Sequence, residues 1–265
     1  MSNALLHRDF KAHRRLLLVF TMVLLMYFIV ILGMYDPANP GLMGQLAAFK
    51  LPPALLAAFG FDLALTELSG FLAGYFYGML MVAFPMVLLV MLANRLVAYL
   101  VERGTMAAVL AGPVTRRQAA LTQGVFLFAC TLSQALVITL AGLLLVAVQF
   151  KGLLDIHAFL RLNAGALCLH LFISGLSFFF SCLFSDTRWS LGLGTGLPVL
   201  FLLMDMLSRV GEKLAVLRYL TPFSLYDPLA LLKGGQAPQV LALLLAGLVF
   251  YGASLAVFDK KDLPL

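Results

Sequence analysis

Few side chains in this sequence have the type and spacing that enzyme chemistry requires. The three cysteines, Cys130, Cys168 and Cys182, lie in apolar runs, and no pair of them has metal-site or redox spacing. The four histidines are scattered and suggest no metal site. There is no G-x-x-x-x-G-K-[ST] phosphate loop and no Ser/His/Asp or His/Glu cluster on one helix face. We therefore expect no catalysis, and no metal, ATP or other cofactor bound by this chain.

Polar side chains within the apolar runs are the remaining candidates for chemistry. Asp205 and Arg209 stand four residues apart, so we expect them to pair with each other rather than to bind a substrate. Gln134 and His170 are isolated, which favours hydrogen bonds between helices. Asn94 lies at the end of a run, where we expect it to reach the lipid headgroups.

The segment 101–118, VERGTMAAVLAGPVTRRQ, is a polar island between two apolar runs. Thr105 is a good N-cap, and residues 106–111 favour a helix of about two turns. Gly112 and Pro113 predict its end.

One face of this short helix is predicted to be apolar, with Met106, Val109 and Leu110 at positions i, i+3 and i+4. Thr115 and Gln118 then form a capping box that starts the next helix. Such a segment is either a capped connector that contacts nothing or a helix that docks on a partner.

Composition places these motifs in a membrane. Hydrophobic residues make up 63% of the 265 residues and charged ones 11%, against about 25% charged in a soluble domain. The net charge of +6 comes without the basic patch and exposed aromatics of a nucleic-acid-binding protein, so lipid is the expected partner. Because about 20 apolar residues cross a bilayer, we expect one all-α transmembrane domain over 1–265. Its six spans are predicted at 16–35, 71–98, 118–149, 161–184, 189–208 and 237–258.

The placement of lysine and arginine predicts that both termini are cytoplasmic. In that orientation 11 of the 18 basic residues lie inside and 7 outside. The inside residues are Arg8, Lys11, Arg14, Arg15, Arg95, Arg103, Arg116, Arg117, Arg188, Lys260 and Lys261. The N-terminal stretch LLHRDFKAHRR collects its basic residues on one side of a helix, which fits an amphipathic helix on the membrane surface or a charged anchor for the first span.

Two outer segments contain prolines that exclude one continuous helix. The segment 36–69 is expected to lie on the outer surface as short pieces. The segment 209–235 is interrupted at Pro222 and Pro228, and two short helices that dip into the outer leaflet would fit.

The polar island resembles the cytoplasmic loop between the second and third spans of type-2 ABC exporter permeases. That family has an acidic residue, Gly-Thr, a short apolar helix and then Pro-Val-(Ser/Thr)-Arg. The matching residues here are Glu102, Gly104, Thr105, Pro113, Val114, Thr115 and Arg116. LTELSGFLAGYF at 65–76, YLTPFSLYDP at 219–228 and FDKKDL at 258–263 also resemble the family, so the likeness covers nearly the whole chain.

The resemblance implies a permease subunit of an ATP-driven exporter in a prokaryotic cell membrane. It would pair with a second permease, identical or related, and with two cytoplasmic ATPase subunits that bind ATP and Mg. The island would be the coupling helix, and its docking residues would be Glu102, Arg103, Gly104, Thr105, Met106, Val109, Leu110, Pro113 and Arg116. Paired re-entrant helices would lie over the exit, with an outer gate at Thr221, Pro222, Phe223, Tyr226 and Pro228.

The first and fifth spans would face the second permease, and Gly192 with Gly196 would allow the helices to approach closely. We expect a hydrophobic or amphipathic substrate. A secondary transporter or channel without an ATPase is the alternative, but neither an internal 3+3 repeat nor an unpaired acidic residue in mid-span supports it.

Overall fold

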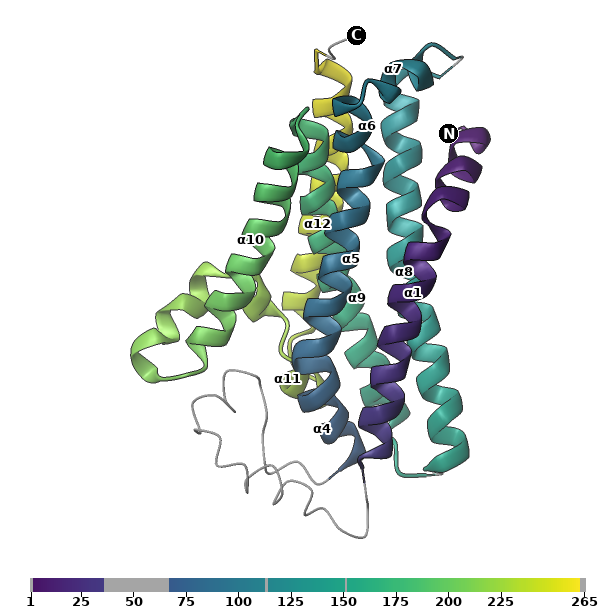
Figure 1. The fold of residues 1–265 in the computed structure, drawn as a ribbon. Helices are drawn as coiled ribbons and strands as arrows, with labels where there is room; N and C mark the ends of the chain where they lie inside the picture. Colours follow the sequence, from purple (N-terminus) through teal and green to yellow (C-terminus); the bar gives the residue numbers. More distant parts are fainter. Residues whose placement is uncertain (1, 36–66, 113, 151, 263–265) are drawn as a thin grey trace.

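The computed structural model describes residues 2–35, 67–112, 114–150 and 152–262 as a bundle of long helices (Figure 1). Six helices in these ranges are long and apolar enough to cross a membrane, which confirms the predicted class. They are Asn3–Gly33, Leu68–Glu102, Arg116–Gln149, Ile156–Leu183, Thr187–Ser208 and Ala237–Lys260. Most of the predicted surface segment 36–69, residues 36–66, lies outside the described residues.

The first helix, α1 (Asn3–Gly33), runs without interruption. The predicted N-terminal stretch and the span predicted to start at residue 16 form one continuous helix. Whether its first turns lie on the membrane surface stays a prediction. No proline or glycine occurs in α1 before Gly33 to break it. Its N-terminal end packs on α8 (Arg116–Gln149): Leu5 is buried, and the backbone N–H of Ser2 donates a hydrogen bond to Thr122 Oγ1 at 3.0 Å.

The second span consists of four consecutive helical pieces. These are α4 (Leu68–Leu72), the π-helix η1 (Ala73–Leu80), α5 (Met81–Leu96) and α6 (Ala98–Glu102). In η1 the bonds reach back five residues, as from the N–H of Met81 to the carbonyl oxygen of Phe76. Pro85 then lies inside α5 and has no N–H to donate to the carbonyl of Met81, four residues earlier.

A neighbouring helix supplies the donor that Pro85 lacks. Nε2 of His170, on α9 (Ile156–Leu183), lies 2.7 Å from the carbonyl oxygen of Met81. The predicted interhelical hydrogen bond of His170 is therefore confirmed. For Gln134 it is not, since its buried Nε2 has no partner among the described residues.

α9 is the central helix of the bundle. It packs against α5, α8, α10 (Thr187–Ser208) and α12 (Ala237–Lys260). It begins five residues before the predicted 161, because the Asp155 carboxylate accepts hydrogen bonds from the N–H groups of His157 and Ala158 and so caps an earlier start.

The backbones of α9 and α12 touch where two glycines face each other. A Cβ added to Gly175 would lie 2.6 Å from the carbonyl oxygen of Gly247, and one added to Gly247 would lie 2.7 Å from the carbonyl oxygen of Leu171. No side chain fits between the two helices at this level.

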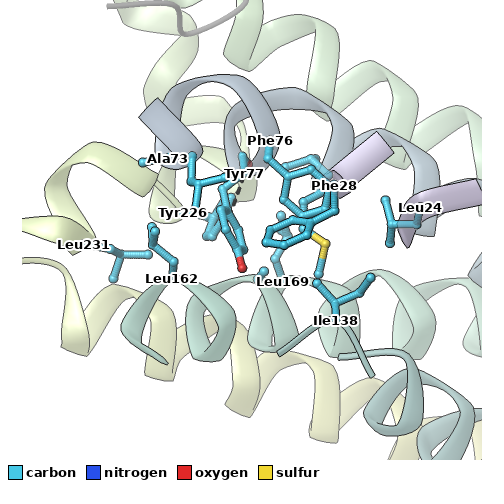
Figure 2. Close-up of a cluster of buried hydrophobic side chains, with 14 of the residues drawn as sticks. Leu24, Phe28, Ala73, Phe76, Tyr77, Ile138, Leu162, Leu169, Tyr226 and Leu231 are labelled. Carbon is cyan, nitrogen blue, oxygen red and sulfur yellow. Dashed lines mark hydrogen bonds between the residues drawn. The ribbon is translucent and has the colours of Figure 1, made fainter. Parts of the chain in front are cut away.

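The largest buried cluster surrounds η1 (Figure 2). Phe28 of α1 meets Phe76 edge to face, with ring centroids 4.9 Å apart. Tyr77 meets Phe159 of α9 in the same way at 6.2 Å. Tyr226 lies beside Tyr77 in Figure 2 and brings the segment 209–235 into this cluster. The cluster holds η1 between α1, α9 and the segment 209–235.

Two further polar contacts involve α10. One stabilises its C-terminal end, and the other joins it to α5. Arg209 donates from Nη2 to Asp205 Oδ2 at 2.8 Å, which confirms the predicted ion pair. Nδ2 of Asn94 donates to Ser190 Oγ on α10 at 2.9 Å. The expectation that Asn94 reaches the headgroups is wrong, because this bond keeps it buried between α5 and α10.

The start of α1 and the end of α12 lie at the same end of the bundle as α7 (Thr105–Leu110). α4 and α11 (Pro228–Leu232) lie at the opposite end (Figure 1). That both termini are cytoplasmic stays a prediction.

Candidate functional site

The polar island folds into a short helix with a glycine at its start. α7 begins at Thr105, and the N-cap is Gly104, whose φ of 68° is left-handed. The prediction of Thr105 as N-cap is wrong by one residue. Its hydroxyl donates backwards to the carbonyl oxygen of Leu100 at 3.1 Å. Only glycine adopts this φ without strain, so Gly104 sets the sharp turn between α6 and α7.

The apolar face of α7 points at its own bundle. Met106 is 2% exposed and belongs to a second buried cluster, against which Val109 and Leu110 pack with part of their surface. Their own bundle therefore covers these side chains at least in part, where α6 and α8 adjoin α7. Their docking on a partner stays a prediction. The outward face of α7 carries Ala108, followed by Ala111.

The start of α8 is confirmed as predicted. The N–H of Gln118 donates to Thr115 Oγ1 at 3.2 Å, and the N–H of Thr115 donates to Gln118 Oε1 at 3.1 Å. This capping box fixes the direction in which the chain leaves the island. Pro113, the predicted helix stop, lies outside the described residues.

Glu102 and Arg103 are exposed side chains at the entrance to the island. Glu102 Oε2 accepts a hydrogen bond of 3.3 Å from the N–H of Thr187, the first residue of α10. The Arg103 guanidinium lies over the Tyr99 ring, 4.4 Å from its centroid. The second span and α10 are therefore joined at this end.

Arg116 binds the end of the chain rather than projecting freely. Its Nη1 donates to the carbonyl oxygen of Lys261 at 2.7 Å. Nζ of Lys261 in turn donates to the carbonyl oxygens of Cys182 at 3.0 Å and Phe184 at 2.6 Å, at the end of α9. Burial lowers the pKa of Lys261 to about 8, so the ammonium form still predominates at pH 7. A cation at a helix C-terminus stabilises it. These bonds join three segments that are distant in the sequence, so the sequence alone did not predict them.

A hollow of about 440 Å³ lies beside the end of α7. It is lined by Ala107, Leu110, Ala111, Val114, Thr115 and Arg116. Small and apolar residues form most of its wall, so it can accept an apolar side chain from another protein.

The segment 209–235, after α10, forms three short helical pieces, η2 (Glu212–Leu220), η3 (Pro222–Leu225) and α11. Its predicted breaks at Pro222 and Pro228 are confirmed, since each proline is the first residue of a new piece. Re-entry of the segment into the membrane stays a prediction.

The predicted gate residues attach this segment to two spans. The Thr221 hydroxyl donates to the carbonyl oxygen of Phe201 on α10 at 2.9 Å. The Tyr226 hydroxyl donates to the carbonyl oxygen of Tyr77 in η1 at 3.3 Å. Burial raises the pKa of Tyr226, which keeps this hydroxyl protonated. Phe223 is also buried, with its ring centroid 6.4 Å from that of Phe201.

Gly192 and Gly196 lie on an exposed face of α10. A Cβ added to either would meet nothing within 4 Å. Trp189, Leu200 and Leu203 are exposed on the same helix. Within this chain the two glycines serve no packing contact among the described residues.

Comparison with known proteins identifies the family to which this arrangement belongs. Residues 3–263 match the family of ABC-2 family transporter proteins, which confirms the resemblance found in the island. No curated protein matches the chain. Members of this family are non-catalytic transport subunits that span the membrane several times and generally pair with ATPase subunits. The chain therefore belongs to the ABC-2 family of transporter membrane proteins.

Proposed function

We propose that this permease is the membrane subunit of an ATP-driven exporter and that an ATPase subunit docks at α7. The observation that carries the proposal is the way α7 is held. Gly104 turns the chain into α7, Met106 anchors α7 on the bundle, and the Thr115 capping box sets the start of α8, which follows. A helix fixed in this way can transmit a push to the spans on either side.

The docking surface is the outward face of α7 together with the hollow beside it. Ala108 and Ala111 allow a partner to approach closely, and the hollow lined by Leu110 receives an apolar side chain. Glu102 and Arg103 add charged contacts at the rim. Two ATPase subunits and two permeases complete the transporter, which moves a hydrophobic or amphipathic molecule outward.

The test of docking is a matched pair of substitutions. Leu110→Asp puts a charge into the hollow, and Leu153→Asp puts the same charge at the opposite end of the bundle, where Leu153 is 46% exposed. The tagged chain is purified from its native membranes, and copurified ATPase is identified by mass spectrometry. The amount of ATPase that copurifies with Leu110→Asp should be at least about tenfold lower than with the wild type, since burying an unpaired charge is costly. Equal recovery from both variants would reject docking at α7.

The direction of transport needs its own measurement. Inside-out vesicles that contain the wild-type complex should accumulate a fluorescent amphipathic probe when ATP is added. Leu110→Asp should abolish the accumulation, and Leu153→Asp should not. Probe uptake by right-side-out vesicles loaded with ATP would show import and overturn the proposed direction.

A further inference from the structure

An apolar groove lies on the membrane-facing surface between α8 and α12. It has a volume of about 170 Å³ and is lined by residues that include Leu121, Gly124, Phe178, Tyr251 and Gly252. Almost all of its wall is carbon. It lies close to the end of the bundle that carries α7, since Leu121 is five residues from the start of α8.

Two glycines create the groove. Gly124 is pressed against the Phe178 ring, which forms part of the wall, and a Cβ there would lie 3.2 Å from Phe178 Cε1. Gly252 faces open space, with nothing within 4 Å of an added Cβ. The Tyr251 hydroxyl is turned away to Ser174 Oγ at 2.9 Å, so the groove itself offers apolar contacts.

One charged side chain from each helix stands above the groove. On α8, Arg117 precedes the groove residues Leu121 and Gly124 by four and seven positions, which places all three on one helix face. On α12, Asp259 follows Leu255 and Gly252 by the same intervals. Arg117 lies about 6 Å above Leu121 along the helix axis, at a rise of about 1.5 Å per residue.

Both of these charges are available to a ligand. Arg117 and Asp259 are exposed, and neither forms an ion pair with another residue in the described ranges. The bond from Arg116 to the Lys261 backbone keeps this end of α8 beside the end of α12, so the two charges cap one groove.

We propose that this groove binds a phospholipid whose headgroup carries a phosphate and a primary amine. One acyl chain fills the groove, the Arg117 guanidinium binds the phosphate, and the Asp259 carboxylate accepts hydrogen bonds from the ammonium group. A lipid with a phosphate but no cation meets the Asp259 charge without compensation. A lipid with a quaternary amine has no N–H to donate to Asp259. The site is separate from the α7 hollow and does not depend on ATPase docking.

The experiment uses the purified, delipidated full chain and native mass spectrometry. Synthetic phosphatidylethanolamine, phosphatidylcholine and phosphatidylglycerol with identical acyl chains are added in turn. The wild type should retain phosphatidylethanolamine at least about tenfold better than the other two, since a charge-assisted hydrogen bond separates them. Equal retention of all three lipids would overturn the proposal.

Substitutions then locate the site. Gly252→Leu fills the groove and should reduce bound phosphatidylethanolamine at least about fivefold, whereas Ala242→Leu places a leucine at an exposed position of α12 outside the groove and should not. Arg117→Ala should weaken binding and Lys260→Ala should not. Both charge variants lie on the surface and leave the core intact, so they decide the matter even if Gly252→Leu misfolds. Lipid retention by Arg117→Ala equal to that of wild type would refute the site.

A third variant tests the assigned headgroup. Asp259→Asn removes the carboxylate that separates an amine headgroup from an anionic one. It should therefore bring phosphatidylglycerol to the level of phosphatidylethanolamine. An unchanged preference of Asp259→Asn for phosphatidylethanolamine over phosphatidylglycerol would show that Asp259 does not bind the amine.

Discussion

The hydrogen bond between His170 and the Met81 carbonyl should contribute to the stability of the fold only because residue 85 is proline. His170→Phe keeps a ring of similar size in the buried site and removes the donor. The Met81 carbonyl is then buried with no donor in its own helix, because Pro85 has no N–H. Pro85→Ala restores that N–H, and the ordinary bond from residue 85 to residue 81 can form.

The expected magnitudes follow from the cost of an unsatisfied buried acceptor, which is about 1–3 kcal/mol. Hydrogen bonds between transmembrane helices average about 0.6 kcal/mol and reach about 1.7 kcal/mol. We therefore expect His170→Phe to destabilise the wild type by about 1–2 kcal/mol. In the Pro85→Ala background the same change should cost less than about 0.5 kcal/mol, which leaves a coupling energy of about 1 kcal/mol.

The assay is a double-mutant cycle measured by reversible unfolding in mixed micelles. His157→Phe is the matched control, since His157 is exposed at the start of α9, and it should change stability by less than about 0.5 kcal/mol in both backgrounds. Equal costs of His170→Phe with Pro85 and with Ala at position 85 would show that His170 does not replace the missing donor. Its burial would then have to be explained by packing alone.

Three further outcomes are expected. Gly196→Leu should reduce recovery of a permease dimer in detergent and leave monomer stability unchanged, because a Cβ added at this position has no described atom within 4 Å. Unchanged dimer recovery would remove α10 as the contact. On a cysteine-free background, Ser2→Cys and Asp262→Cys should both resist an impermeant thiol reagent in intact cells, and labelling of either would contradict the cytoplasmic orientation. Tyr226→Phe removes the hydrogen bond to the Tyr77 carbonyl, which is worth about 0.5–1.5 kcal/mol. Amide hydrogen exchange in residues 222–225 should therefore become faster. Exchange at the wild-type rate would mean that packing alone holds the segment.

Local chemistry predicted those features that depend on neighbours in sequence. The capping box at Thr115 and the new helices at Pro222 and Pro228 follow from side chains within three residues of the backbone groups that they affect. The pair of Asp205 and Arg209 follows from helical spacing alone. These predictions needed no knowledge of which helices are adjacent.

Features that depend on adjacent helices were not predictable from one sequence. Met106 carries the right pattern for docking, but the helices packed around α7 decide whether it faces a partner or the bundle. Asn94 was expected at the headgroups, and Ser190, 96 residues away, keeps it inside. Pro85 did carry an unused signal: a proline within an apolar run leaves a carbonyl that another helix must satisfy, and His170 was the isolated donor.

The backbone contact between Gly175 and Gly247 sorts the helices by which of them can move during a transport cycle. Side chains can change rotamer to let two helices slide, but two backbones in contact have nothing that can yield. We therefore expect α9 and α12 to keep their relative position, so that any rearrangement falls to the other helices. In a library of all single substitutions, any larger residue at position 175 or 247 should prevent the chain from folding. Larger residues at positions 192 and 196 should allow the chain to insert and fold but should impair the assembly of subunits.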